Sequence, residues 1–450
     1  MEFRRVILIF VLTLSAVVLL GLGALAAYHF TGGMGREEAA SATDMETEEE
    51  EQSAASPVSF EPAPAAEESA AAEASTEPEP EPEPEPEEPE IVEEPEEIDP
   101  YAEVEEDFFI RRAPAADPDV VTMAFAGDIL FDKSYAIQAR MPAENGIASV
   151  VGSSLLEEMN RVDLMVINNE FPYTDRGAPQ ADKAFTFHAH PRTVRQLKDM
   201  GADLVSLANN HTFDYGEEGF LDTLDTLDRA GVPRVGAGRD IDEASHPMYF
   251  LVDGMKIGVI AATQIERHAS PNTRGATETL PGVFRCLDDT KLCEKVREAR
   301  AECDFLIVFI HWGTENETQP DWLQVQQAPE IAAAGADLII GGHSHCLQPL
   351  GYSGDVPVVY SLGNFLFNSK TLDTVLIECE IERVDPAQDG DEPIPPGSRA
   401  KLKSLRFMPC IQSGCSVRFA EGAEADRILQ FMRGISKGVA IDEEGYFTKE

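Results

Sequence analysis

From residue 120 onward, short apolar runs alternate with polar loops and with segments of helical period. The runs are rich in Val, Ile and Leu without polar alternation, which is typical of strands buried inside a layered α/β domain. A stretch rich in Pro, Gly and Asp, 385–398, is expected to be a loop. The expected strands are 120–126, 163–167, 203–207, 256–262, 304–310, 337–340, 356–361, 402–408 and 416–419, and the expected helices are 154–160, 192–200, 219–230 and 423–434.

The beginning of the chain has a different pattern. Residues 6–27 are apolar and uncharged, and they follow Arg4 and Arg5. This run reaches the ~20 residues that a helix needs to cross a bilayer. The arginines before it orient the remainder of the chain outward. We therefore expect residues 1–30 to be a membrane anchor, with the C-terminal domain outside the cell. The alternative is a signal peptide cleaved near Ala24-Leu25-Ala26, which would give a secreted protein.

Residues 31–118 are strongly acidic. The whole chain has 82 Asp and Glu against 35 Lys and Arg, for a net charge of −47, and residues 77–90 are almost purely alternating Glu and Pro. Such a segment has too little apolar surface to offset its conformational entropy. We therefore expect a disordered acidic linker over 31–118 and a folded domain over 119–450. The acidic composition also argues against nucleic acid as a partner, since its phosphates require Lys and Arg.

Seven cysteines lie in the predicted domain. In an oxidising extracellular setting some of them should form disulfides, and the odd count leaves at least one thiol over. Cys286 with Cys293 and Cys410 with Cys415 are the local candidate pairs, although spacing alone leaves the connectivity open. The sequence has no CxxC pair, which excludes a zinc ribbon.

Polar residues with metal-binding or catalytic chemistry follow six of the predicted strands directly. In open α/β sheets, ligands bind at the carboxyl ends of the strands, so these residues should meet at one edge. His343 and His345 are the sharpest signal, because two imidazoles behind a pair of glycines can converge on a metal ion. The strand-end groups are Gly127-Asp128, Asn168-Asn169-Glu170, Asn209-Asn210-His211, His311-Trp312-Gly313, Gly341-Gly342-His343-Ser344-His345 and Leu362-Gly363-Asn364.

Each of these residues taken alone also has a purely structural interpretation. Asp128 is as well placed to cap a helix, and a lone histidine such as His311 at the end of an apolar strand is usually a core residue. The second HxH pair, His188 and His190, precedes a predicted helix with no strand end beneath it. We interpret that pair as substrate-side or structural. His246 and His268 lie in loops, and we assign them no role.

The order of these motifs resembles the capsule-synthesis CapA family, also called the poly-γ-glutamate synthesis family, within the calcineurin-like metallophosphoesterase superfamily. The resemblance covers roughly residues 120–380 and implies a four-layer α/β/β/α sandwich. The matching motifs are Ala-Gly-Asp-Ile-Leu at 126–130, Asn-Asn-Glu at 168–170, Leu-Ala-Asn-Asn-His-Thr-Phe-Asp-Tyr-Gly at 207–216, Gly-Ala-Gly at 236–238, His-Trp-Gly-Thr-Glu at 311–315, Gly-Gly-His-Ser-His-Cys-Leu-Gln-Pro at 341–349 and Ser-Leu-Gly-Asn-Phe at 361–365.

The resemblance also implies a site that holds one or two divalent transition-metal ions, Mn, Zn or Fe. This sequence departs from the superfamily at two positions: Leu130 stands where a histidine is usual, and Glu170 stands in place of a bridging Asp. The departures favour one tightly held ion, with a second weak or absent. The positions that match metal ligands are Asp128, Asn210, His311, His343 and His345, and Glu170 is a further candidate.

His211 matches the acid that protonates the leaving group. We expect Asp214, three residues later, to orient it, and Glu315 to act as a base or an extra ligand. The resemblance implies a role in making, exporting or trimming an anionic cell-surface polymer such as poly-γ-glutamate, with polymer-synthesis membrane proteins as possible partners. The residues by themselves indicate only metal-assisted hydrolysis.

Three functional classes are therefore open at this point. The first is a metal-dependent hydrolase or transferase that acts on an envelope polymer. The second is a secreted phosphatase or nucleotidase, whose cationic pocket would use Arg176, Lys183, Arg192 and Arg195. The third is a scaffold without catalytic activity in a capsule-synthesis complex.

Overall fold

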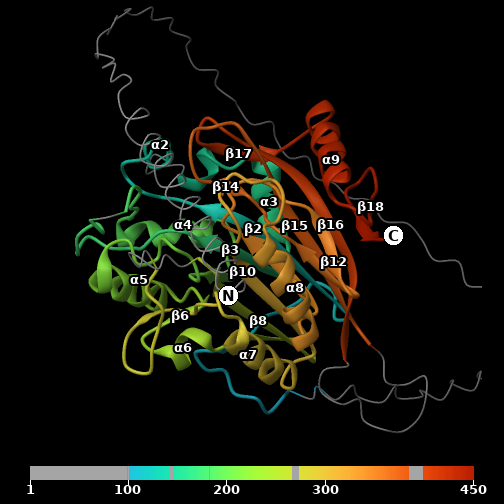
Figure 1. Ribbon diagram of the computed structural model, residues 1–450, viewed down its shortest axis with the longest axis horizontal. Helices are drawn as coiled ribbons and strands as arrows, with labels where there is room; N and C mark the ends of the chain where they lie inside the picture. Colours follow the sequence, from blue (N-terminus) through green and yellow to red (C-terminus); the bar gives the residue numbers. More distant parts are fainter. Residues whose placement is uncertain (1–98, 100, 142–145, 182, 266–272, 385–398) are drawn as a thin grey trace, which may run out of the picture. The chain divides into compact units, whose positions relative to one another are not determined.

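The computed structural model describes residues 99, 101–141, 146–181, 183–265, 273–384 and 399–450, all of which belong to the compact unit Ile91–Glu450 (Figure 1). The predicted anchor and all but the last part of the predicted linker lie outside the described residues, and so does the predicted loop 385–398. In the described part of the chain, no helix is both long enough and apolar enough to cross a membrane.

Two large mixed β-sheets form the framework of the described unit. In the first sheet, β2 to β5 run parallel, β14 pairs with β2, and an antiparallel set from β15 to β17 lies on the other side of β2. Its order is β17 (Ser416–Phe419), β16 (Ala400–Ser413), β15 (Leu372–Arg383), β2 (Val120–Ile129), β3 (Leu164–Asn169), β4 (Leu204–Ser206) and β5 (Arg234–Val235), with β14 (Asn364–Leu366) beside β2.

The second sheet has a parallel centre, in which β8, β10, β11 and β13 pair in that order. Antiparallel hairpins and one added parallel strand extend it at its edges. Its order is β1 (Ile110–Arg112), β7 (Met248–Val252), β8 (Met255–Thr263), β10 (Phe305–His311), β11 (Leu338–Gly342), β13 (Val356–Val359) and β12 (Leu350–Ser353).

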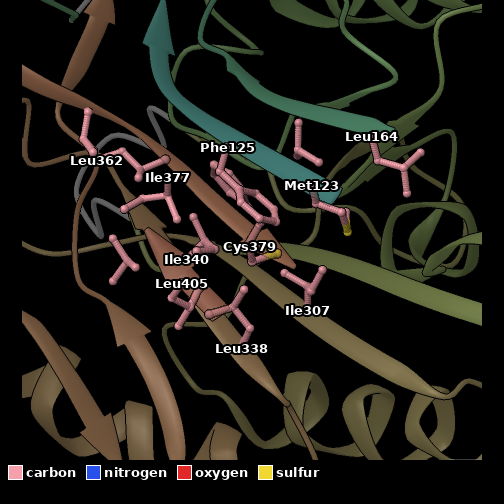
Figure 2. Close-up of a cluster of buried hydrophobic side chains, with 14 of the residues drawn as sticks. Met123, Phe125, Leu164, Ile307, Leu338, Ile340, Leu362, Ile377, Cys379 and Leu405 are labelled. Carbon is pink, nitrogen blue, oxygen red and sulfur yellow. The ribbon is translucent and has the colours of Figure 1, made fainter. Parts of the chain in front are cut away.

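The two sheets pack face to face, and helices cover their outer faces. Successive side chains of a strand point to opposite faces, so Met123 and Phe125 of β2 enter the core between the sheets, while Ala124 faces the helices. Figure 2 shows Ile307 and Ile340 of the second sheet meeting them. Full burial of each such large apolar side chain contributes about 1.5–3 kcal/mol to stability.

The helices form the outer layers and close one end of the core between the sheets. Those on the first sheet include α3 (Ser153–Arg161), α4 (Arg195–Asp199) and α5 (Gly216–Ala230), and those on the second are α7 (Thr290–Arg300) and α8 (Trp322–Ala334). Apolar residues of α9 (Ala423–Ile435) join the core between the sheets. The smaller elements are α2 (Ala136–Ala139), α6 (Ile241–Ser245), η1 (Gly146–Ser149), η2 (Pro191–Val194), β6 (Ala237–Gly238), β9 (Gly282–Val283), β18 (Val439–Ile441) and β19 (Phe447–Lys449).

The predicted layered α/β class is confirmed, and each expected strand is present, with shifted ends in all but 416–419. The expected helix 192–200 is split into η2 and α4. The sequence pattern missed the twelve-residue strand β15 and the two helices α7 and α8. The inner part of β15 carries Val375, Leu376 and Ile377 on two buried faces, so its composition fits a strand once its neighbours are known.

The predicted disulfides are absent. Cys293, Cys410 and Cys415 are free thiols, so neither local candidate pair forms. The strand register explains why Cys410 and Cys415 do not pair. β16 sets Cys410 opposite Phe419, while Cys415 lies in the turn of the same hairpin with a φ of 66°. Cys410 is buried among apolar side chains, where a thiol packs as a small apolar group.

Residues just before the predicted domain boundary are part of the fold. β1 pairs with β7 in parallel, with Ile110 opposite Tyr249. The Tyr101 hydroxyl donates to Asp304 Oδ2 at 2.7 Å, and the Phe109 ring stacks on His246 at 3.9 Å between centroids. The folded unit therefore begins before the predicted boundary at residue 118.

A chain that begins at Pro118 is therefore expected to be less stable than one that begins at Asp99. It loses the β1 ladder, the Tyr101 bond and the Phe109 contact. Together these contribute about 2–4 kcal/mol, at ~1 kcal/mol per hydrogen bond plus part of one aromatic burial. Thermal melts of the two chains measure the difference, and a shorter chain that melts several degrees lower confirms it. Equal melting midpoints would show that this segment adds no stability.

Candidate functional site

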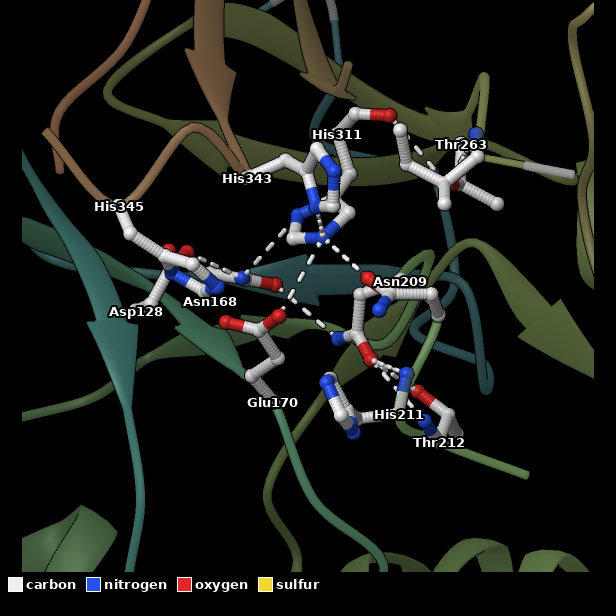
Figure 3. A network of polar contacts seen from close by, with 12 residues as sticks. Asp128, Asn168, Glu170, Asn209, His211, Thr212, Thr263, His311, His343 and His345 are labelled. Atoms are coloured by element: carbon white, nitrogen blue, oxygen red, sulfur yellow. Dashed lines mark hydrogen bonds and ion pairs between the residues drawn. The ribbon is translucent and has the colours of Figure 1, made fainter. Parts of the chain in front are cut away.

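The strand-end residues meet at one edge, between the carboxyl ends of the two sheets. The first sheet supplies Asp128 at the end of β2 and Glu170 directly after β3, and the second supplies His311 as the last residue of β10 (Figure 3). All three side chains are fully buried. Gly127 allows this convergence, because a Cβ there would lie 2.0 Å from the carbonyl oxygen of Gly363.

The loop after β11 carries the HxH pair in an unusual backbone conformation. His343 has a φ of 91° and His345 a φ of 58°. Both values lie in the left-handed region of backbone conformation, which residues other than glycine rarely adopt. Such strain costs on the order of 1–3 kcal/mol per residue and concentrates at functional sites. The conformation turns the His343 ring toward His311 and the His345 ring toward Asp128 (Figure 3).

Two groups of donor atoms overlap in this site, and in each group the atoms lie within 4.8 Å of one another. The first contains Glu170, His311 and His343: His343 Nδ1 lies 3.1 Å from His311 Nε2, which lies 3.4 Å from Glu170 Oε1. Asn210 Oδ1 is 2.8 Å from the same His311 nitrogen. An amide oxygen therefore adds a fourth donor to this group.

The second group contains Asp128, Glu170 and His345, so Glu170 belongs to both. His345 Nδ1 lies 3.2 Å from Asp128 Oδ2 and 2.9 Å from Asn364 Oδ1. The two groups could hold one or two ions, and the Glu170 carboxylate is common to both.

The protonation states and unmet bonds of these residues fit a divalent cation. Among the described residues, neither oxygen of the buried Glu170 carboxyl has a hydrogen-bond partner. Burial raises the pKa of Glu170 well above the usual carboxyl range, and the charge of Asp128 adds to the shift. A buried carboxylate of this kind is costly without a counter-charge. A bound ion would supply that counter-charge. The surrounding nitrogen and oxygen donors are of the type that Mn, Zn and Fe accept.

His311 and His343 are held in the form that ligates metal. Burial lowers the pKa of His311 to about 3, against the pull of Asp128, and burial also lowers the pKa of His343 well below its usual value. Neutral imidazole is the ligating form. At His345 burial also acts to lower the pKa, but the hydrogen bond to Asp128 and the charge of Asp128 outweigh burial and raise the pKa.

Asparagines behind the donor groups fix their orientation. Asn168 Nδ2 donates to Asp128 Oδ1 at 2.7 Å, and Asn209 Nδ2 donates to Asn168 Oδ1 at 3.2 Å and to the Asn169 carbonyl at 2.9 Å. Supporting residues of this kind orient metal ligands and tune their affinity. These asparagines follow strand ends in the sequence and were given no role there, although their repetition after adjacent strands was a usable signal.

A histidine–aspartate dyad lies beside the donor groups. His211 Nδ1 is 2.7 Å from Asp214 Oδ2, as the three-residue spacing suggested, and both side chains are buried. The Phe187 ring packs on the His211 ring with centroids 4.2 Å apart. Burial lowers the pKa of His211, while the charge of Asp214 opposes the shift. This hydrogen bond leaves Nε2 of His211 as the nitrogen available to a reacting group.

Two positions singled out from the sequence lie apart from this arrangement. Glu315 is exposed on the loop after β10 and joins neither donor group among the described residues. Its charge still acts on His345. Leu130, where the resemblance led us to expect a histidine, is fully buried in the apolar cluster on the helix side of the first sheet.

The second HxH pair and the cationic residues have other surroundings. His190 accepts from the Arg192 backbone N–H and begins η2, while His188 packs against Tyr215. Arg176 is mostly exposed and pairs with Asp222. Arg192 and Arg195 are exposed. Lys183 alone of the four cations reaches the dyad, where it contacts Asp214.

Comparison with known families decides the relationship. The sequence profile of the family described as bacterial capsule synthesis protein PGA_cap matches residues 122–369, more than half of the chain. The chain belongs to this family. The resemblance predicted from the strand-end motifs is thereby confirmed.

Several curated relatives carry PGA, capsule or polyglutamine names. The PGA biosynthesis protein CapA of Bacillus subtilis (strain 168) is 30% identical over 274 residues, covering 59% of this chain and 69% of the relative. The capsule biosynthesis protein CapA of Bacillus anthracis is 32% identical over 208 residues, covering 45% of this chain and 50% of the relative. A probable polyglutamine synthesis accessory protein of Mycobacterium tuberculosis (strain ATCC 25618 / H37Rv) is 25% identical over 287 residues, covering 56% of this chain and 75% of the relative.

Likeness to solved structures is weaker. A 5'-nucleotidase from Candida albicans SC5314 shares 11% identity over 65% of this chain and 52% of its own, with a TM-score of 0.34. The protein TT1561 of Thermus thermophilus shares 9% identity over 57% of this chain and 93% of its own, with a TM-score of 0.33. These low TM-scores carry no argument about the site or its substrate.

Proposed function

We propose that this PGA_cap family member is a metallophosphoesterase-like, metal-dependent hydrolase or transferase. Its substrate would be an anionic envelope polymer such as poly-γ-glutamate, during synthesis, export or trimming. We further propose that an N-terminal helix anchors it in the cell membrane with the folded domain outside. The observation that carries the enzymatic proposal is the position of the His211–Asp214 dyad beside two donor groups that share Glu170.

In this proposal the chain binds the ion through the two donor groups already described. Glu170, His311, His343 and Asn210 would hold one ion, and Asp128, Glu170 and His345 a second where one binds. The ion, when bound, lowers the pKa of a water molecule and polarises an acyl or phosphoryl oxygen. Asn168 and Asn209 keep the carboxylate of Asp128 in place.

His211 would move the proton that the leaving group requires. Hydrolysis of an amide adds the hydroxyl of water to the acyl carbon and breaks the C–N bond, so the departing nitrogen takes up a proton. Asp214 holds Nδ1 of His211 and stabilises the imidazolium, and Nε2 delivers the proton. Because burial lowers the pKa of His211, its imidazolium is a strong donor.

The proposal is tested with the purified full chain and poly-γ-glutamate. The release of new amino termini is measured with Mn²⁺, Zn²⁺ or Fe²⁺ and again after chelation. We expect release that falls at least tenfold on chelation and returns when the ion is restored, as metal-assisted chemistry requires. Polymer output is followed in parallel in producing cells that lack the gene. No release with any ion, together with polymer output that depends on the protein, would identify a scaffold instead.

A further inference from the structure

Lys183 is a buried cation that comes from outside the strand ends. It lies on the connection between β3 and η2, and its side chain is only 6% exposed. A buried ammonium group is costly unless it is paired and hydrogen-bonded. Its Nζ donates to Asp214 Oδ1 and to the backbone carbonyl of Asn210. Both acceptors belong to the segment that carries His211.

The first of these bonds completes the surroundings of Asp214. Asp214 is fully buried. Its Oδ2 faces His211 Nδ1 at 2.7 Å and accepts from the Phe187 backbone N–H at 2.7 Å, while Oδ1 accepts from Lys183. With partners on both oxygens, the carboxylate cannot rotate without breaking a bond. The plane and direction of the His211 ring are set by this carboxylate and by the packed Phe187 ring.

The second bond fixes the peptide that joins two functional side chains. The Asn210 carbonyl accepts from Lys183, while the Asn210 side-chain oxygen lies 2.8 Å from His311 Nε2. His211 follows directly on the other side of the same peptide. A shift of this peptide would therefore move the donor oxygen of Asn210 and the ring of His211 together.

We propose that Lys183 is a positioning residue that sets the His211–Asp214 dyad and the Asn210 donor in register with each other. The proposal rests on the function proposed above for these residues. A lysine suits this place because its ammonium carries three donors on a compact charge, whereas the planar fork of arginine is built to match a single carboxylate. Loss of a supporting residue of this kind typically costs 10–100-fold in activity or metal affinity.

The test is a double-mutant cycle on the purified full chain, with amino-terminus release from poly-γ-glutamate as the rate. Lys183→Met, which keeps the length and removes the donors, is expected to lower the rate about 10–100-fold. Combined with His211→Gln, it is expected to lower the rate by clearly less than the product of the two single losses, because the part of its effect that acts through the dyad is already gone. Multiplying losses would overturn the proposal, and so would full activity of Lys183→Met. Lys198→Met, on the exposed side of α4, is the matched control.

A second readout does not depend on activity. Co²⁺ is bound to the full chain and its visible absorption is recorded, because the bands report the geometry of the ligands. Lys183→Met is expected to shift these bands through Asn210, and Lys198→Met to leave them unchanged. An unchanged spectrum in Lys183→Met overturns the link to Asn210 even when no turnover is found, so this result is distinct from failure of the proposed function. If Lys183→Met does not fold, Lys183→Gln, which retains a neutral donor, takes its place in both experiments.

Discussion

Replacing His211 with glutamine is expected to lower the turnover of the purified chain by about 10²–10⁴-fold, the usual contribution of general acid catalysis. Glutamine keeps a polar side chain of similar reach but cannot transfer a proton. Asp214 would still accept a hydrogen bond from the amide, so its buried carboxylate keeps a partner. The fold and the metal content should therefore persist while the rate falls.

The measurement is the initial rate on poly-γ-glutamate, with protein level and metal content checked in the same preparation. His246→Gln is the control, because His246 stacks on Phe109 and belongs to neither donor group. If the protein is a scaffold, a different result is expected. Polymer output in complemented cells would then be unchanged by His211→Gln but altered by the loss of His343 and His345. Full activity of purified His211→Gln would remove the dyad from the mechanism.

Changing His343 and His345 together to alanine is expected to abolish metal binding. The first donor group loses one of its two imidazoles and the second group loses its single imidazole, and Glu170 is left without a counter-charge. Elemental analysis should find at least one transition-metal ion in the wild-type chain and less than roughly a tenth of that in the variant. Ligand binding to the folded state stabilises it by about 2.7 kcal/mol at a hundred times the Kd. Added metal should therefore raise the melting midpoint of the wild type and leave that of the variant unchanged.

The chain offers a matched control for this experiment in its other HxH pair. His188→Ala/His190→Ala removes two histidines at the same spacing, but neither belongs to a donor group. That variant should keep the wild-type metal content. Equal metal in the two double variants, or loss only in the His188 and His190 variant, would contradict the site.

Most of the candidate site was predictable because its signals are local. A buried parallel strand is a continuous apolar run, and the residues after it lie at the carboxyl edge. Asp128, Glu170, His311 and the HxH pair were found in this way, and the structure brings them together. Glu315 was inferred from a motif alone, and it lies on an exposed loop outside the donor groups.

The same reasoning explains what the sequence missed in the fold. β15 ends in a segment, residues 378–383, in which four of six residues are charged, so its composition resembles a surface segment, although β16 pairs with it along its length and β2 over residues 376–382. β1 is three residues long and follows an acidic stretch, so no periodicity marks it. Both strands exist because a neighbouring strand provides the hydrogen-bond partners, and that neighbour is distant in the sequence.

The sequence by itself determined the α/β class and the residues of the candidate site, because both depend on short-range patterns of burial and strand ends, and its motifs pointed to the family. Only the tertiary structure decided how those residues are connected. Lys183 and Asp214 are separated by 31 positions, and Tyr101 and Asp304 by 203. Contacts of this kind depend on how loops and sheet edges pack, and no local pattern records them. Tertiary packing likewise decided that Glu170 belongs to both donor groups and that Cys410 and Cys415 remain thiols.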